Sequence, residues 1–185
     1  MKSNKTKNIT TALIATAAAA IAFCFAGCET VSKAKNMIAS SKPAAQNIKI
    51  TIDKTLENTS IQIDLVGANP VSDLSKWETY SVTEYWQPGN ATRRDADRAT
   101  LDFGRGKPST QVFSKKDSRW KRWLDTGAAR LVILADLPGV AAGGTNDQRR
   151  LIIPIDAKSW QKSGGDPIEI LVQESGLRLL TPRTP

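Results

Sequence analysis

Strict alternation of apolar and polar residues in two neighbouring stretches constrains the fold more than any other feature of this sequence. Residues 47–53 (NIKITID) and 60–66 (SIQIDLV) place apolar side chains at alternate positions. Successive side chains of a strand point to opposite faces, so this period is typical of strands with one buried face. Glu57 and Asn58, between the two stretches, favour a hairpin turn. We therefore expect the folded region to begin with β-structure.

Further short segments rich in β-branched, aromatic and apolar residues predict the remaining strands. They are residues 77–86, 99–103, 110–113, 130–136, 149–155, 168–174 and 177–180. The segment 130–136 is the most continuously apolar of these, which is typical of a strand covered on both faces. The predicted fold class is mainly β: an antiparallel β-sandwich of about eight short strands with one helical insertion.

The helical insertion is predicted at residues 114–124, which also carry the main concentration of positive charge. Ser114 can cap the helix, and Trp120, Trp123 and Leu124 share one helical face that would pack on the sandwich. The segment's cations are Lys115, Lys116, Arg119, Lys121 and Arg122. Two interpretations stay open: a solvated basic face over a tryptophan core, or a surface that binds an acidic partner or an anionic envelope component. We take these five cations as candidate partner-binding residues.

The N-terminus has the pattern of an export signal. Three lysines, Lys2, Lys5 and Lys7, precede an apolar run at residues 12–25, which is too short to span the ~20 residues that a bilayer requires. The run ends in residues 25–28 (FAGC), which resemble the lipobox of bacterial lipoproteins. That resemblance implies that Cys28 receives a lipid and becomes the new N-terminus. The alternatives are cleavage elsewhere or a short retained anchor, either of which would leave Cys28 as a free thiol.

The export signal sets the expected domain organisation and compartment. Residues 1–27 form a signal peptide that is removed, residues 28–46 a flexible tether, and residues 47–185 the β-sandwich domain. A coil of the tether's length spans roughly 25 Å. The lipoprotein resemblance implies anchoring through the N-terminal lipid at the periplasmic face of the outer membrane, because Glu29, and not the aspartate of enteric inner-membrane retention, follows Cys28.

Composition excludes several classes of catalytic site. The chain contains no histidine, which rules out histidine general bases, serine and cysteine systems that depend on histidine, and histidine zinc ligands. Its two cysteines, Cys24 and Cys28, both precede the folded region. The loop at residues 104–110 (GRGKPST) has the wrong glycine spacing for a phosphate-binding Walker loop. We therefore predict a protein that is not an enzyme, with no catalytic residue, metal, cofactor, nucleic acid or small-molecule substrate.

The order of the predicted elements resembles the small outer-membrane lipoprotein of the type VI secretion membrane complex. The resemblance is carried by Asn69 and Pro70 ahead of a strand, the apolar strand 131–136, the strand 150–155 after a loop, and the closing pair within 168–180. It implies a β-sandwich that anchors a trans-envelope complex by binding the periplasmic part of an inner-membrane protein. The predicted function is a lipid-anchored assembly protein that binds an envelope partner. The alternative is a module that binds anionic glycan, peptidoglycan or lipid headgroups through the basic helix.

Overall fold

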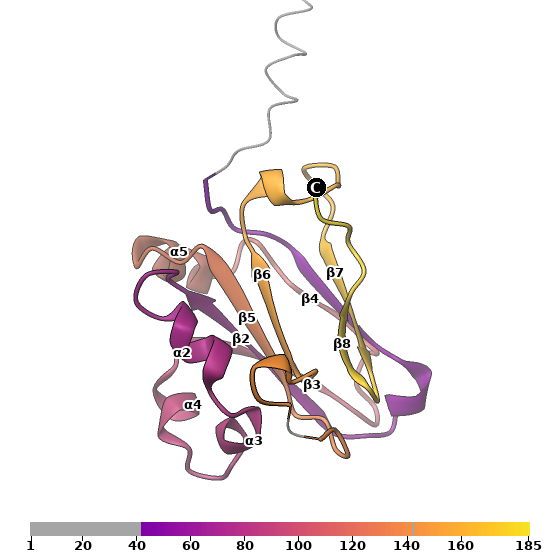
Figure 1. The fold of residues 1–185 in the computed structure, drawn as a ribbon. Coiled ribbons are helices and arrows are strands. Elements are labelled where there is room, and N and C mark those ends of the chain that lie inside the picture. The colour runs from indigo at the N-terminus through magenta and orange to yellow at the C-terminus, as the bar shows by residue number, and fades with distance from the viewer. Residues whose placement is uncertain (1–41, 142) are drawn as a thin grey trace, which may run out of the picture. The chain divides into compact units, whose positions relative to one another are not determined.

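Two four-stranded sheets form the folded unit. The computed structural model describes residues 42–141 and 143–185. The strands are β1 (Ile48–Ile52), β2 (Ile61–Ala68), β3 (Arg98–Phe103), β4 (Thr110–Phe113), β5 (Arg130–Ala135), β6 (Arg150–Pro154), β7 (Ile168–Gln173) and β8 (Gly176–Leu179). Their order is β4-β1-β7-β8 in one sheet and β3-β2-β5-β6 in the other (Figure 1). The predicted mainly-β sandwich is confirmed.

Strand pairing departs from a wholly antiparallel sandwich at one place. The pair β1 and β7 is parallel, with Ile48 opposite Ile168 and Ile52 opposite Val172, whereas the other pairs are antiparallel. The expected hairpin between residues 47–53 and 60–66 is wrong, because β1 and β2 lie in different sheets. A short 3-10 helix, η1 (Lys54–Leu56), takes the chain across, and its N-cap Asp53 accepts a hydrogen bond from the Thr55 backbone N–H.

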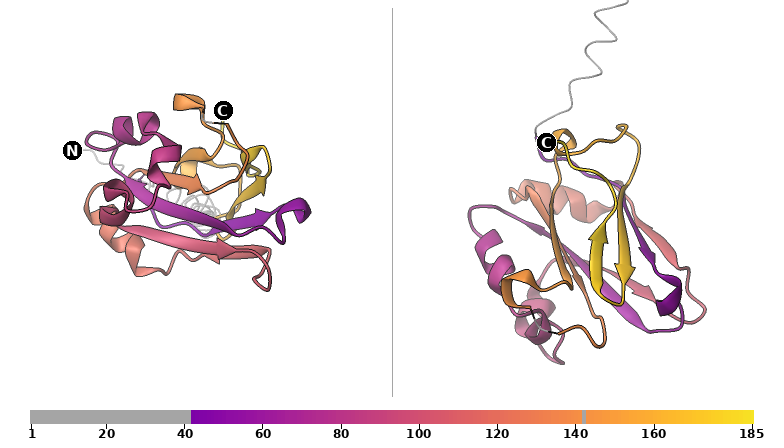
Figure 2. Two further views of the ribbon diagram at one scale, coloured as in Figure 1. Left: turned by 90° about the horizontal axis from the view of Figure 1, so that it is seen from below. Right: turned by 45° about the vertical axis from the view of Figure 1, so that its right-hand side comes forward.

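Alternation along the strands builds the core between the sheets. Ile48 and Ile50 of β1 and Ile61 and Ile63 of β2 are fully buried, as the two-residue period predicts. β5 is buried on both faces, as its continuous apolar run predicts, because helices cover the outer face of its sheet. The layers are visible edge-on in Figure 2, where the two sheets face each other.

The helical layer occupies the segment that was predicted as a strand at residues 77–86. The structure has helices α2 (Leu74–Thr79), α3 (Val82–Tyr85) and α4 (Ala91–Asp95) there. Trp77, Val82 and Tyr85 are buried against residues of β2 and β5 on the outer face of the β3-β2-β5-β6 sheet. Figure 1 shows the helices beside this sheet. The helices form because Trp77 and Tyr80, and again Val82 and Tyr85, lie three residues apart, which places each pair on one helical face. The Ser81 side chain also caps α3 by accepting a hydrogen bond from the Glu84 N–H. Helices therefore enter the fold at two places and not one.

The predicted helix at 114–124 is α5 (Ser118–Asp125), which begins later than expected. Asp117, and not Ser114, is its N-cap and accepts from the Arg119 N–H. Trp120 and Trp123 are 2% and 3% exposed, so the core interpretation of the tryptophans is correct. Both indole rings lie within 5.6 Å, centroid to centroid, of the Phe113 ring. Two 3-10 helices, η2 (Gly144–Asn146) and η3 (Ala157–Ser159), complete the described elements.

A buried carboxylate attaches the helical layer to its sheet. Asp64 of β2 is 0% exposed and accepts hydrogen bonds from the Tyr85 hydroxyl (3.0 Å), the Arg93 Nε (2.8 Å) and the Thr100 hydroxyl (2.6 Å). The Arg98 guanidinium lies 3.3 Å away. Burial raises the pKa of Tyr85, and the Asp64 charge raises that pKa further, so the tyrosine stays a donor. One carboxylate thus links α3, α4 and β3 to the centre of the sheet.

A second buried ion pair connects the loop before β6 to the same helices. The Asp147 and Arg149 side chains lie 2.6 Å apart and are 2% and 9% exposed. Arg149 also donates to the Thr83 hydroxyl at 2.9 Å. Burial opposes ionisation of Asp147, but the hydrogen bonds from Arg149 and from the Gly143 N–H outweigh it and lower the pKa of Asp147. The helical layer is therefore held from both sides.

Candidate functional site

The five cations predicted to bind a partner all lie in one segment of the folded unit. Lys115 and Lys116 lie in the turn between β4 and α5, whereas Arg119, Lys121 and Arg122 lie on α5 itself. The local fold explains their placement, because Trp120 and Trp123 bury one face of α5 and direct the charged positions away from it. The turn and the helix differ in whether their cations contact carboxylates of the same domain.

The three cations on α5 each contact a carboxylate of the same domain. The pairs are Arg119 with Asp117 (3.0 Å), Lys121 with Asp125 (2.6 Å) and Arg122 with Asp97 (2.7 Å). Hydrogen bonds from Arg122 lower the pKa of Asp97, which keeps that pair charged. Such exposed pairs contribute only about 0–1 kcal/mol to stability, yet they neutralise the helix surface locally. These pairings were not predicted from the sequence, although the i,i+4 spacing of Lys121 and Asp125 was a visible signal.

Lys115 and Lys116 form the part of the segment that stays positive. Within the described residues neither lysine side chain contacts a carboxylate. Both border an open hollow of about 410 Å³, whose lining also includes Trp120, Leu124, Lys121 and the carboxylates Asp117 and Asp125. The hollow therefore combines ammonium groups, apolar surface and two carboxylates, and these two carboxylates are paired with Arg119 and Lys121 and not with Lys115 or Lys116.

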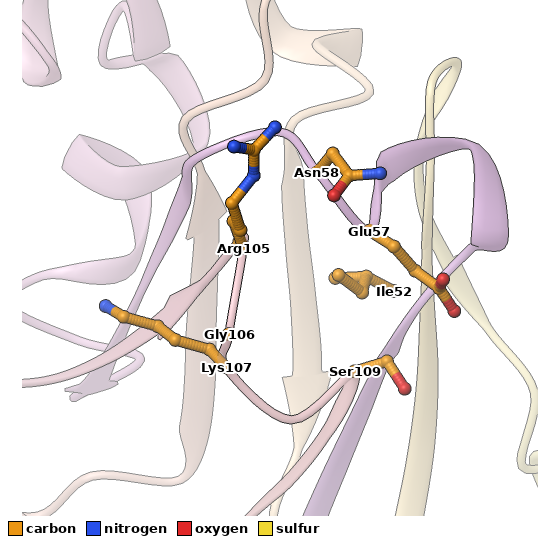
Figure 3. Close-up of a pocket in the computed structure, with 8 residues that line it drawn as sticks. Ile52, Glu57, Asn58, Arg105, Gly106, Lys107 and Ser109 are labelled. Atoms are coloured by element: carbon orange, nitrogen blue, oxygen red, sulfur yellow. The ribbon is translucent and has the colours of Figure 1, made fainter.

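A second hollow lies where the β1–β2 loop faces the β3–β4 loop (Figure 3). It measures about 320 Å³ and is lined by polar groups that include Glu57, Asn58, Arg105 and Lys107. Figure 3 shows Glu57 and Lys107 extending in opposite directions, and Lys107 lies 3.8 Å from Asp102. The charges do not converge on one point, so this hollow is not a built binding site for an ion.

The loop at 104–110, whose glycine spacing does not match a phosphate-binding loop, connects β3 of one sheet to β4 of the other. Gly104 and Gly106 have φ values of 138° and 77°, which non-glycine residues rarely adopt, so the glycines serve the turn. Across the described ranges, no group of three or more side chains of the metal-ligating kinds comes together. No described helix is long and apolar enough to cross a membrane.

The predicted lipid anchor lies outside the described residues. Cys28, the signal peptide 1–27 and residues 28–41 of the tether belong to the part of the chain that the structure does not describe, so these assignments stay predictions. The described chain makes its first strand-like contact at Pro43, which forms a β-bridge with Asp156. The Ala44 N–H then donates to the Ile155 carbonyl at 3.2 Å. Contacts with the sandwich therefore begin ahead of the predicted start at residue 47.

Comparison with known proteins identifies similar folds but no similar sequence. No family model matches the chain, and no curated protein matches it. A solved structure described as "Type VI membrane complex" aligns with 73% of this chain and 96% of its own at a TM-score of 0.50 and 12% sequence identity. At this identity the likeness concerns the fold alone.

Two further structures align with lower TM-scores. One is Serratia marcescens Lip, described as a membrane bound component of the Type VI Secretion System, at 14% identity, TM-score 0.47, and coverage of 75% of this chain and 96% of that one. The other is the T6SS lipoprotein TssJ1 from Pseudomonas aeruginosa, at 10% identity, TM-score 0.42, and coverage of 77% and 99%. The likeness in fold rests on the match at a TM-score of 0.50, the structure described as "Type VI membrane complex".

Proposed function

We propose that this chain is a lipid-anchored, non-enzymatic assembly protein of a type VI secretion membrane complex, held at the periplasmic face of the outer membrane. The observation that carries the proposal is the fold likeness to the type VI membrane complex structure, which extends over 96% of that chain at a TM-score of 0.50. The match of residues 25–28 to a lipobox supports the anchor. In this role the domain binds an envelope protein and fixes it near the membrane.

The buried ion pairs of the domain fit such a role. The buried carboxylates Asp64 and Asp147 tie the helical layer to the sheet through Arg93 and Arg149. A surface that is already ordered loses little conformational entropy when a partner binds, so more of the contact energy appears as affinity. In this role the protein acts by binding a partner through its surface, and no residue is assigned to catalysis or to a cofactor.

Deletion of the gene in its native host tests the assembly role. We expect type VI–dependent release of effector proteins into the medium to be lost and to return when the full-length chain is supplied. The complementing chain should also co-purify with other components of the secretion membrane complex. Unchanged secretion in the deletion strain would refute the proposal.

The anchor has its own test, with a control inside the same signal. Burial of acyl chains contributes ~0.8 kcal/mol per CH₂, and stable anchoring needs more than one chain, so a lipidated Cys28 would decide membrane residence. Cys28→Ala should abolish labelling by a fatty-acid analogue and leave an unprocessed precursor or a soluble exported species. Cys24→Ala should be labelled like wild type, because Cys24 leaves with the signal. Labelling of both variants would contradict the lipobox assignment.

Lys115 and Lys116 favour a second candidate function, the binding of anionic glycan, peptidoglycan or lipid headgroups. They border the hollow beside Trp120, and within the described residues neither forms an ion pair, although Asp117 and Asp125 line the same hollow. Each lysine near an anionic membrane contributes about 1 kcal/mol, so charge reversal at both should weaken binding to anionic vesicles at least about tenfold. Lys158→Glu, on η3, is a matched control at an exposed lysine. Equal sedimentation of both variants with vesicles and with peptidoglycan would exclude this function.

A further inference from the structure

Three of the four sheet edges in the described structure are obstructed, two of them by side chains. Along β3, the Arg98 carbonyl accepts from Arg119 Nε at 3.0 Å, and the Asp102 carbonyl accepts from Gln111 Nε2 at 2.7 Å. Along β6, the Ile152 carbonyl accepts from Arg183 at 3.1 Å. Each of these contacts places a side chain across the edge, where it obstructs an incoming strand.

The edge strand β8 is closed by backbone contact. The Leu177 N–H donates to the Gln148 carbonyl at 2.8 Å, across the gap to the other sheet. Gly176 lies so close to the same residue that a Cβ there would be 2.5 Å from the Gln148 carbonyl oxygen. β8 also carries the charged side chain Arg178 near its centre. An added strand has no room at this edge.

β4 differs from these three edges. Residues of an antiparallel pair alternate between those that bond to the neighbour and those that face away. The Ile52 N–H donates to the Ser109 carbonyl at 2.8 Å, and the register pairs Ile50 with Gln111, so odd-numbered residues of β4 bond to β1. The N–H and C=O groups of Thr110 and Val112 therefore face the outer edge, where no described residue pairs with them.

The composition of β4 also leaves this edge open. The strand TQVF carries no charged residue, and Val112 is 53% exposed. Charged side chains are the usual protection of a free edge, and here they flank the strand and do not interrupt it. Arg105 and Lys107 precede β4, and Lys115 and Lys116 follow it. Lys107 is the one of these four that a described carboxylate approaches, at 3.8 Å.

We propose that β4 is a docking edge at which an extended segment of an envelope protein adds to the sheet as a further strand, its short uncharged centre flanked on both sides by acidic residues. The proposal rests on the assembly role argued above. The partner strand bonds to Thr110 and Val112, covers the Val112 side chain, and directs its carboxylates to the cations at each end. A second copy of this chain is disfavoured as the occupant, because β4 against β4 would bring these cations together.

A proline substitution separates the free edge from the strand's own ladder. Val112→Pro removes an N–H that faces outward and leaves the β1–β4 hydrogen bonds in place, which edge strands tolerate. Val112→Thr is the matched control, since it keeps the N–H and the β-branched shape. Charge reversal of Lys115 and Lys116 to glutamate gives a second variant that leaves the strand itself unchanged.

The probe is a synthetic peptide of alternating threonine and valine flanked by glutamates, added to the purified full-length chain. With this peptide we expect slower hydrogen exchange in a fragment that covers β4. A lysine-flanked peptide should bind at least tenfold more weakly. The protection from exchange should be lost in Val112→Pro and in the charge-reversed variant and retained in Val112→Thr. Unchanged exchange, equal binding of both peptides, or a wild-type dimer that Val112→Pro dissociates would each overturn the proposal.

Complementation distinguishes this inference from the assembly role. If Val112→Pro restores secretion to the deletion strain as well as Val112→Thr does, the docking edge is refuted while the assembly role stands. If deletion leaves secretion unchanged, the assembly role fails, and the peptide experiment still decides whether β4 accepts an acidic-flanked strand.

Discussion

Replacing Asp64 with alanine should be among the most damaging single substitutions in the domain. The carboxylate is fully buried and accepts three side-chain hydrogen bonds, from Tyr85, Arg93 and Thr100. Alanine leaves the two hydroxyls without this acceptor and the Arg93 and Arg98 guanidinium groups without their carboxylate. It also creates a cavity at the centre of β2.

The decrease in the free energy of unfolding depends on how well water can replace the carboxylate as a partner for each of these groups. Breaking a buried ion pair costs about 3–5 kcal/mol, and each buried hydroxyl left unpaired costs about 1–3 kcal/mol. The Arg93 and Arg98 side chains are 24% and 29% exposed, so water recovers part of the loss. We expect a decrease of roughly 3–5 kcal/mol in the free energy of unfolding. For a domain of this size that lowers the melting temperature by roughly 6–20 °C.

Chemical denaturation of the full-length chain, followed by tryptophan fluorescence, measures this loss. Tyr85→Phe removes one of the three donors and keeps the aromatic packing, so it should cost about 1–2 kcal/mol. Asp125→Ala is the matched control, because it breaks the exposed pair with Lys121 and should cost less than about 1 kcal/mol. Hydrogen exchange should also quicken in α3 and α4 of Asp64→Ala. If Asp64→Ala costs no more than Asp125→Ala, the attachment of the helical layer through this carboxylate is wrong.

Three further predictions concern packing and pH. Trp120→Ala should cost about 3–5 kcal/mol in thermal melts, because the indole is 2% exposed; an unchanged melting temperature would show that the side chain is not core. Gly67→Ala should cost about 1–3 kcal/mol, because its Cβ would lie 2.5 Å from Cγ of Trp123, and Gly89→Ala, where φ is 76° and no atom lies within 4 Å of the added Cβ, is a comparison for backbone strain alone. Because folding lowers the pKa of Asp147, its stabilisation is fully present above the unfolded value of about 3.9 and is lost as pH falls through the lower folded-state pKa, so the gap in unfolding free energy between wild type and Asp147→Asn should narrow as pH falls below about 4. A gap that does not narrow on acidification would contradict this.

Strands could be predicted from the sequence where only one face of the strand is buried, because apolar and polar residues then alternate. The Ile48–Ile52 segment alternates because only its inner face is covered, and the structure places it as the sequence indicates. In β2, the alternation of apolar and polar residues does not predict which side chains are buried. Its alternation places Asp64 on the polar face, yet the structure buries that face under α3 and α4. A one-dimensional pattern reports polarity, not burial, so a polar side chain that another element covers cannot be identified from its own strand.

The helical layer was missed although a signal was present. Aromatic and β-branched content favoured a strand at residues 77–86, but Trp77 and Tyr80, and again Val82 and Tyr85, are three residues apart. Ser81 followed by Glu84 three residues later is also the pattern of a helix N-terminus. The spacing was therefore better evidence than the composition. The neutralised face of α5 was missed for another reason, since Asp97 meets Arg122 only after the chain folds.

The parallel pairing of β1 with β7 has a consequence for the order in which the chain folds. Lys49 and Glu169 face each other across these strands, although they are 120 residues apart in sequence. A chain that appears from its N-terminus completes β3-β2-β5-β6 by Pro154, while one side of β1 still lacks its neighbour. Closure of so long a loop is entropically costly and slows folding. While the chain emerges N-terminus first into the compartment where it folds, it therefore passes through an interval in which β1 exposes hydrogen-bonding groups that other chains or chaperones can bind.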